Sequence, residues 1–185
     1  MSPIELAAAA LGLVNIVLVV RRSVWNYPFA LAMVSLYAWV FFGAKLYSDA
    51  LLQIFFIVVN LYGWANWARS RAEAGEVRVE SLGWPARAGW IVAVAAATAL
   101  WGWLMHRHTD ASFPWWDAGI AMLSVAGQIL MSRRYWENWL FWIAADLIAV
   151  PLYAAKNLWA TSALYAIFLA MCIVGVIGWG KARRG

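Results

Sequence analysis

Long apolar runs constrain this chain more than any other feature. Seven of them can be read along its 185 residues, at 4–20, 27–43, 50–67, 87–105, 115–132, 136–154 and 159–179. Each approaches the ~20 helical residues that cross the ~30 Å hydrocarbon core of a bilayer. Within that core a helix satisfies its own backbone hydrogen bonds, whereas an isolated strand does not. Because hydrophobic residues make up 65% of the chain and charged residues 12%, we predict an all-α integral membrane protein with seven transmembrane helices.

The basic residues are divided unequally between the two ends of these segments. Eleven of the fourteen Lys and Arg residues follow the first, third, fifth or seventh segment, and the other three are Lys45, Arg107 and Lys156. Loops on the cytoplasmic side of a membrane are enriched in Lys and Arg. The 11:3 division therefore predicts an external N-terminus and a cytoplasmic C-terminus. The net charge of +5 is attributed to this membrane surface, and no nucleic acid partner is predicted.

The chain matches itself weakly when it is shifted by 112 positions, a displacement that we call the repeat offset. "RRSVWNYPF" (21–29) aligns with "RRYWENWLF" (133–141), so that two arginines, an asparagine and a phenylalanine coincide. Further along, the same offset places Gly63 on Gly175 without a gap. The match predicts an internal repeat in which the second and third segments correspond to the sixth and seventh.

Two three-helix units follow from this repeat. Within one transmembrane domain at 1–185, we predict a first repeat at 4–67, a linker helix at 87–105 and a second repeat at 115–179. Both repeats enter the membrane from the same side, so they are parallel, and the fourth helix makes this 3+1+3 order possible. Some transporters are built from parallel repeats and hold their substrate between them near the middle of the bilayer.

Hydrogen-bonding and aromatic side chains gather on one face of several segments when residues are placed at about 100° intervals. The residues of these stripes are Asp49, Gln53, Phe56, Asn60, Trp64 and Trp67 on the third segment; Asp117, Ser124 and Gln128 on the fifth; Asn138, Trp139, Trp142, Asp146 and Tyr153 on the sixth; and Thr161, Tyr165, Phe168, Cys172 and Gly175 on the seventh. Such stripes predict an enclosed cavity whose walls stack on a ring and hydrogen-bond its substituents. Trp139, Trp142 and Asp146 are expected to face that cavity, together with the third segment.

Asp146 is the most informative candidate for a site residue. It lies ten residues past Trp136 and therefore near the middle of the membrane. An aspartate at that depth costs ~2.5–3.5 kcal/mol on insertion scales, so it is predicted to face the bundle interior with a partner. Two interpretations stay open. The partner is either a serine, tyrosine or glutamine of another helix, or it is a cationic or polyhydroxylated ligand. The same two interpretations stay open for the amides of Gln53, Asn60 and Asn138: each either hydrogen-bonds another helix or contacts a ligand.

Most of the fifteen tryptophans need no functional explanation. Eight lie near the ends of predicted spans, where an interfacial belt or packing accounts for them: Trp25, Trp67, Trp84, Trp90, Trp115, Trp116, Trp159 and Trp179. Glu137 points away from the stripe on its segment and is expected at the cytoplasmic edge, in a capping or surface role.

Several other functions of seven-helix proteins are excluded by missing motifs. A retinal photoreceptor needs a lysine deep within a helix, whereas the lysines here lie at segment ends. The metalloprotease motif HExxH and the nucleophile motif GxSxG are absent. His106 and His108 lack nearby carboxylate or cysteine ligands. We therefore predict neither an enzyme nor a cofactor or metal site, while a non-transporting membrane scaffold or receptor remains an alternative.

Three stretches together resemble the PnuC family of bacterial vitamin transporters: "YSDALLQIFFIVVNLYGWANWAR" (47–69), "FPWWDAGIAMLSVAGQILMSRRYWENWLFW" (113–142) and "AKNLWATSALYAIFL" (155–169). The resemblance implies a fold similar to full-length SWEET transporters and a homotrimer in the bacterial inner membrane. It implies import of nicotinamide riboside by facilitated diffusion, with cytoplasmic phosphorylation trapping the vitamin.

The resemblance also points to substrate-binding residues. They are Gln53, Phe56, Asn60, Tyr62 and Trp64 on the third segment, Trp136, Asn138, Trp139 and Trp142 on the sixth, and Tyr165 on the seventh. Relatives in the family carry thiamine or riboflavin, and some nicotinamide riboside members have asparagine where this chain has Asp146. The carboxylate disfavours riboflavin but does not separate the cations nicotinamide riboside and thiamine, so a thiamine uniporter is the main alternative.

Overall fold

The computed structural model describes residues 3–43, 47–110 and 112–183. Its elements are α1 (Pro3–Val20), α2 (Asn26–Gly43), α3 (Tyr47–Ala74), α4 (Trp84–His108), α5 (Pro114–Ser132), α6 (Asn138–Ala155) and α7 (Trp159–Ala182). Among these described residues the only strand-like pairing is a single bridge between Glu80 and Tyr135. The prediction of an all-α protein with seven helices is confirmed.

The helix limits lie within a few residues of the predicted ones except in α3. This helix continues to Ala74, seven residues beyond the predicted end at Trp67. The extension "ARSRAEA" consists mainly of alanine, arginine and glutamate, which have high helix propensity. A prediction based on apolar runs stops where the charges begin, although the backbone remains helical.

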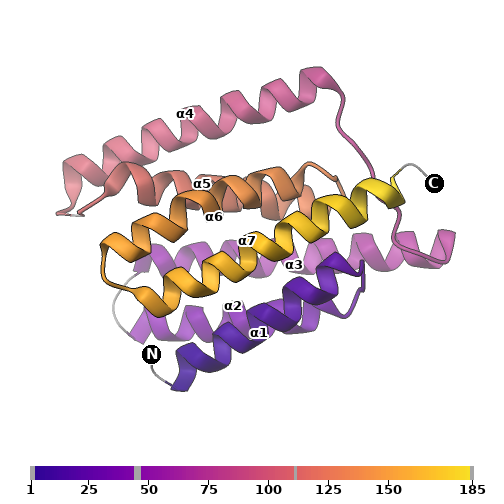
Figure 1. Ribbon diagram of the computed structural model, residues 1–185, viewed down its shortest axis with the longest axis horizontal. Helices are drawn as coiled ribbons and strands as arrows, with labels where there is room; N and C mark the ends of the chain where they lie inside the picture. Colours follow the sequence, from indigo (N-terminus) through magenta and orange to yellow (C-terminus); the bar gives the residue numbers. More distant parts are fainter. Residues whose placement is uncertain (1–2, 44–46, 111, 184–185) are drawn as a thin grey trace.

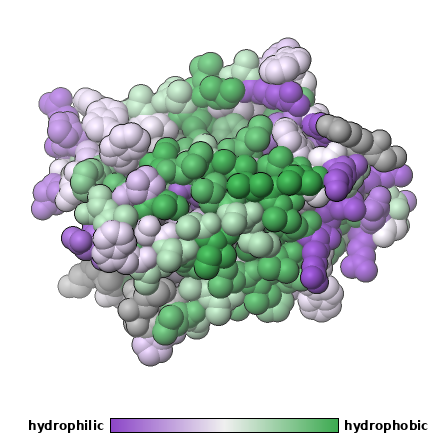
Figure 2. Space-filling model, in the orientation of Figure 1, coloured by the Kyte–Doolittle hydropathy of each residue, from purple (hydrophilic) through white to green (hydrophobic). Residues whose placement is uncertain are grey.

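Apolar surface dominates the middle of the molecule. By length and hydropathy alone, three of the described helices, α4, α6 and α7, are able to cross a membrane, and Leu6–Val20 of α1 forms a shorter apolar helix. Figure 2 shows hydrophobic residues across the centre of one face and hydrophilic residues at both ends.

Six helices form a closed ring in the order α1, α2, α3, α5, α6 and α7, with α7 returning to α1. Helix α4 lies outside this ring against α5, at one edge of the bundle (Figure 1). There the ring of Trp115 packs directly over Gly102 of α4, which has no side chain to obstruct it. In the ring, α3 lies opposite α7, and α2 lies opposite α6.

One end of the bundle, called the basic end below, is where α1, α3, α5 and α7 finish. It carries Arg21 and Arg22 after α1, Arg133 and Arg134 after α5, and Lys181 in the last turn of α7. This is the end that the sequence predicts to be cytoplasmic. Of the three basic residues assigned to the other end, Lys45 lies outside the described residues.

Elements related by the repeat offset have matching structures. The offset carries both limits of α2 onto those of α6, and it carries the start of α3 onto the start of α7. Arg22 and Arg134 both adopt a left-handed backbone, with φ of 55° and 66°. Their amides donate to the carbonyls of Val19 and Met131 over the same 2.9 Å. The turn between α1 and α2 is thus repeated between α5 and α6.

Glu137 fastens the start of α4 to the turn between α5 and α6. Its side chain is only 2% exposed, and it accepts hydrogen bonds from Ser81 Oγ at 2.8 Å, the Leu82 amide at 3.1 Å and Arg87 Nη2 at 2.7 Å. The expectation of a surface role is therefore wrong, because the long connection from α3 folds over this carboxylate. Burial raises the pKa of Glu137, but its own amide and those three donors outweigh burial and hold that pKa below its usual value.

Replacing Glu137 with alanine should lower the free energy of unfolding by about 2 kcal/mol, because a hydrogen bond to a charged group contributes ~1.5–3 kcal/mol. The change is measured as a lower thermal midpoint of the purified protein in detergent. The matched control is Glu76→Ala, which breaks the exposed Arg22–Glu76 pair at 3.2 Å and should change stability by less than ~1 kcal/mol. Equal effects of the two substitutions would contradict this role.

The same carboxylate predicts a pH dependence. Because the folded-state pKa of Glu137 is lowered, its stabilisation is present above the unfolded pKa of ~4.3 and is lost as pH falls through the folded value. The thermal midpoint of the wild type should therefore fall more steeply below about pH 4 than that of Glu137→Gln, which does not titrate.

Candidate functional site

Four aromatic side chains fill the interior of the six-helix ring near the basic end: Tyr27 of α2, Trp67 of α3, Trp139 of α6 and Trp179 of α7. We call them the aromatic layer. All four are buried. The ring centroids of Trp67 and Trp179 are 5.6 Å apart. Tyr27 meets Trp67 edge to face at 5.3 Å, and Trp139 meets Trp179 in the same way at 5.5 Å. The four rings therefore form a continuous row across the interior.

Two indole hydrogen bonds extend this layer to the remaining helices of the ring. Trp67 Nε1 donates to the carbonyl of Met131 in α5 at 2.9 Å. Trp179 Nε1 donates to the carbonyl of Val19 in α1 at 3.1 Å. Donors and acceptors both correspond under the repeat offset. All six ring helices are thus joined at one level, by a pattern that each half repeats.

Two glycines allow aromatic side chains of this layer to approach the neighbouring helix closely. A β-carbon at Gly175 of α7 would lie 2.5 Å from the ring of Trp139. At the corresponding position in α3, a β-carbon on Gly63 would lie 2.6 Å from the hydroxyl of Tyr27. Only glycine leaves room for the ring at these two positions.

A polar layer lies about 10 Å further from the basic end, since seven residues separate Asn60 from Trp67 and Cys172 from Trp179. Gln128 Nε2 of α5 donates to Asn60 Oδ1 of α3 at 3.0 Å. The Cys172 thiol of α7 donates to Asp146 Oδ2 of α6 at 3.6 Å. All four side chains are buried. Asp146 thus faces the interior as predicted, with a cysteine as its partner.

Five buried polar atoms have no hydrogen-bond partner among the described residues; one is Arg134 Nε, and the other four belong to the aromatic layer or to the residues just before it. Tyr27 Oη and Trp139 Nε1 belong to the layer itself. Asn26 Oδ1 and Asn138 Oδ1 belong to the residues just before them. Each asparagine donates its amide to the carbonyl three residues earlier, at 2.8 and 2.7 Å. These four unpaired atoms again come in two pairs related by the repeat offset.

Aromatic side chains also flank the polar layer on the side away from the basic end. The ring centroid of Tyr165 in α7 lies 5.1 Å from that of Tyr153 in α6, and Tyr165 meets Phe168 edge to face at 5.8 Å. Trp142 packs on Gly127 of α5. Trp139 and Trp142 thus each lie against a glycine of a neighbouring helix.

The structure brings most of the predicted site residues into this interior. Asn60, Asn138, Trp139 and Asp146 are buried, and Gln53, Phe56, Trp142 and Tyr165 are partly buried. Helices α3 and α6 are not neighbours in the ring. Trp179 of α7 contacts both Trp67 of α3 and Trp139 of α6.

Three predicted residues lie apart from the interior. Tyr62 is 51% exposed, because it lies about 200° around α3 from Asn60. Trp64 is 38% exposed and lines a small cleft of about 240 Å³ with Trp25 and Arg71. Trp136 lies at the basic end, where its Nε1 donates to the carbonyl of Val176.

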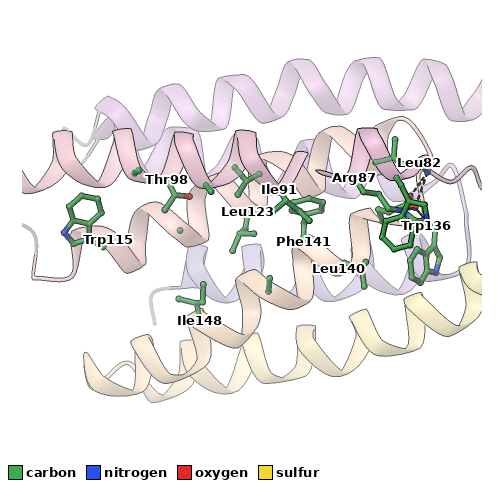
Figure 3. A pocket seen from close by; sticks show the side chains of 17 residues that line it. Leu82, Arg87, Ile91, Thr98, Trp115, Leu123, Trp136, Leu140, Phe141 and Ile148 are labelled. Atoms are coloured by element: carbon green, nitrogen blue, oxygen red, sulfur yellow. Dashed lines mark hydrogen bonds and ion pairs between the residues drawn. The ribbon is translucent and has the colours of Figure 1, made fainter. Parts of the chain in front are cut away.

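An open apolar groove of about 940 Å³ runs between α4 and the outer surface of α5 and α6. Figure 3 shows Trp115 at one end, Leu82, Arg87 and Trp136 at the other, and aliphatic and aromatic side chains between them. Of the predicted substrate-binding residues, its lining includes Trp136 alone. The groove is thus separate from the polar layer.

Asn26 and Tyr27 were not predicted to belong to the site, and Trp179 was attributed to the interfacial belt or to packing. Trp67 was attributed in the same way although it lies on a predicted stripe. Gln128 and Cys172 also lie on predicted stripes but were not predicted to bind substrate. Trp67 and Trp179 are buried in the core, unlike the exposed Trp25, Trp84, Trp115, Trp116 and Trp159. The repeat contained the missing signal. Extending the match four residues beyond Gly63 and Gly175 pairs Trp67 with Trp179.

These observations define the class of protein. An apolar helical bundle holds two structurally related halves around a buried interior of amides, one carboxylate and aromatic rings. Among the described residues, no group of three or more His, Cys, Asp or Glu side chains could hold a metal ion. These features are typical of a multi-pass membrane protein with a polar interior.

The chain belongs to the nicotinamide mononucleotide transporter family, whose model matches residues 2–181. It is 30% identical to the nicotinamide riboside transporter PnuC of Escherichia coli (strain K12), over 100% of this chain and 87% of that protein. It is also 30% identical to the riboflavin/roseoflavin transporter RibM of Streptomyces davaonensis, over 97% of this chain and 85% of that protein.

A crystal structure of the vitamin B3 transporter PnuC has the same fold. The TM-score is 0.75 and the sequence identity 27%, and the match covers 96% of this chain and 80% of that one. The resemblance to the PnuC family is confirmed. Together with the apolar helices, these relatives identify a multi-pass protein of the bacterial inner membrane.

Replacing Gly175 with alanine should destabilise the protein by ~1–3 kcal/mol, because the added methyl group overlaps the ring of Trp139. Gly178→Ala is the matched control on the same helix. A β-carbon there meets nothing within 4 Å, so the higher helix propensity of alanine should leave stability unchanged or raise it by up to ~1 kcal/mol. Thermal midpoints of the two variants measure the difference, and similar midpoints would refute the close approach.

Proposed function

We propose that this protein imports nicotinamide riboside across the bacterial inner membrane by facilitated diffusion. The observation that carries the proposal is the environment of Asp146. Its carboxylate is 3% exposed, and the described residues supply it with a thiol but no cationic side chain. A carboxylate buried without a positive partner is costly. The pyridinium ring of nicotinamide riboside would provide that positive charge.

The neighbouring groups suit the rest of the molecule. The amides of Asn60, Gln128 and Asn138 can hydrogen-bond a carboxamide or the hydroxyls of a ribose. Trp139, Trp142 and Tyr165 offer faces on which a flat ring can stack. A substrate entering this region would take over contacts that the side chains now make with one another.

The charges favour the riboside over its phosphorylated form. The buried charged side chains of the described residues are Glu137 and Asp146, with no lysine or arginine among them. A phosphate group buried in protein needs such cations or several amide donors. Near Asp146 it would meet a negative charge instead. We therefore assign the unphosphorylated vitamin, with a cytoplasmic kinase trapping it after entry.

We further propose the 3+1+3 plan of SWEET transporters, with α1–α3 and α5–α7 as parallel repeats and α4 as their linker. The helix limits and turns that match under the repeat offset support it. The basic end faces the cytoplasm in this proposal, so that the N-terminus is external. The proposed assembly is a homotrimer, as the family resemblance implies.

Two other vitamins are alternatives on the same fold. Riboflavin is favoured by the similarity to RibM, but its neutral ring system leaves Asp146 without a cationic partner. Thiamine is a cation and satisfies Asp146 as nicotinamide riboside does. The alternative of another class is a membrane scaffold or receptor, which would transport none of these vitamins.

Calorimetric titration of the purified protein with nicotinamide riboside, nicotinamide mononucleotide, thiamine and riboflavin tests the assignment. We expect the riboside to bind most tightly, and uptake into proteoliposomes to persist when ion gradients are dissipated. Tight binding of thiamine without binding of the riboside would refute the assignment. Absence of both binding and uptake for all four would favour a scaffold.

The role of Asp146 can be isolated by comparing the riboside with its reduced dihydro form, which has nearly the same shape but no charge. Asp146→Asn should reduce the preference for the cation by at least about tenfold, or ~1.4 kcal/mol. Affinity for the neutral form should change little. Asp117→Asn is the matched control, because Asp117 pairs with Lys156 at 3.0 Å near the opposite end. An unchanged preference in Asp146→Asn would exclude a charge contact.

A further inference from the structure

We propose that the aromatic layer is the gate at the basic end, and that Trp67 and Trp179 must separate before the transported molecule can pass. The identity of that molecule rests on the proposed function, whereas the position of the gate rests on the packing described above. The polar layer lies on one side of this gate and the basic end on the other.

The packing of the layer closes the central path. Trp67 and Trp179 come from helices on opposite sides of the ring, and their centroids are 5.6 Å apart. Aromatic rings at 4.5–7 Å are already in contact, so no third ring fits between them. Tyr27 and Trp139 continue the row on either side. A flat ligand therefore cannot cross this level while the row is intact.

The gate is shared equally by the two halves of the molecule. Trp67 of the first half donates to Met131 of the second, and Trp179 of the second donates to Val19 of the first. If the halves move as rigid bodies, a rotation that separates them at this end breaks both hydrogen bonds together. Two equivalent hydrogen bonds thus stabilise the closed state.

The unpaired polar atoms favour the opposite state. Asn26 Oδ1, Tyr27 Oη, Asn138 Oδ1 and Trp139 Nε1 are buried without partners among the described residues. Leaving a polar atom buried and unpaired disfavours a conformation. Opening the layer would expose these atoms to water or to the polar groups of a passing ligand. The two indole hydrogen bonds therefore stabilise the closed state, and hydrogen bonding of the four unpaired atoms stabilises the open state. A gate with two populated states requires both contributions.

Cys172 is a natural reporter for this gate. It is the one cysteine in the sequence, it is buried, and it lies in the polar layer beyond Trp179 as seen from the basic end. A thiol reagent that arrives from the basic end must cross the aromatic layer to reach it. Its labelling rate measures opening without any vitamin present.

The test labels Cys172 with a membrane-impermeant, trimethylammonium-bearing thiosulfonate in inside-out vesicles and in spheroplasts. Trp67→Phe and Trp179→Phe each remove one indole donor. Each should accelerate labelling from the cytoplasmic side about fivefold, since one hydrogen bond is lost, and the two accelerations should be equal. Trp39→Phe is the control, because Trp39 is 77% exposed on α2 and should leave the rate unchanged.

Tyr27→Phe gives a prediction of opposite sign. It keeps the ring but removes a hydroxyl that has no partner among the described residues. Labelling from the cytoplasmic side should slow, and the thermal midpoint should rise. This variant decides the question if either tryptophan variant fails to fold.

Several outcomes would overturn the gate. These are unchanged labelling in tryptophan variants that fold as the wild type does, acceleration only from the external side, or faster labelling in Tyr27→Phe. The expected labelling pattern in a protein that does not bind nicotinamide riboside would support the gate and refute the proposed substrate. The two proposals therefore fail separately.

Discussion

Two indole hydrogen bonds connect the halves of this molecule where its six ring helices meet. A buried indole N–H needs an acceptor, and here each acceptor is a carbonyl near the end of a helix in the other half: Met131 in α5 for Trp67, and Val19 in α1 for Trp179. These bonds fix how α3 lies against α5 and how α7 lies against α1. Within each half, Gly63 and Gly175 let Tyr27 of α2 approach α3 and Trp139 of α6 approach α7. The relative placement of the halves therefore depends on this one level.

The two levels of the interior differ in symmetry. In the aromatic layer, rings, donors and acceptors repeat between the halves. In the polar layer, Asn60 of α3 corresponds to Cys172 of α7, and Asp146 of α6 corresponds to Val34 of α2. A repeated layer suits a closure that both halves make together. A layer that is amide-rich on one side and acidic on the other suits an asymmetric ligand such as a cationic ring joined to a sugar.

Much of the fold could be predicted from the sequence because the bilayer restricts the choice of structure. Apolar runs of this length must be helices, and their limits were predicted closely except where α3 continues through charged residues to Ala74. Helical periodicity also placed Asn60, Asn138 and Asp146 on inward faces. Periodicity failed for Trp64, since a correct face does not reveal whether another helix covers it at that height.

Residues near helix ends were the least predictable part of the site. An aromatic side chain at a span end is equally suited to a lipid interface and to a buried contact, so Trp179 could not be told from Trp84 or Trp159 by position. Trp67 lies on the polar stripe of its segment, but its position near the span end still allowed a belt role. Glu137 was expected in a capping or surface role because it is charged and lies near a segment end. Its burial depends on the connection after α3, which folds back over it to supply Ser81, Leu82 and Arg87.

The sequence by itself determined the membrane class, the helices, the repeat and the inward position of Asp146, because each follows from hydrophobicity or periodicity along one chain. Only the tertiary structure decided which side chains meet across the ring. It paired Asp146 with Cys172, and it turned two tryptophans near helix ends into the central contact between the halves. Such pairings depend on distances between separate helices, which no local pattern specifies.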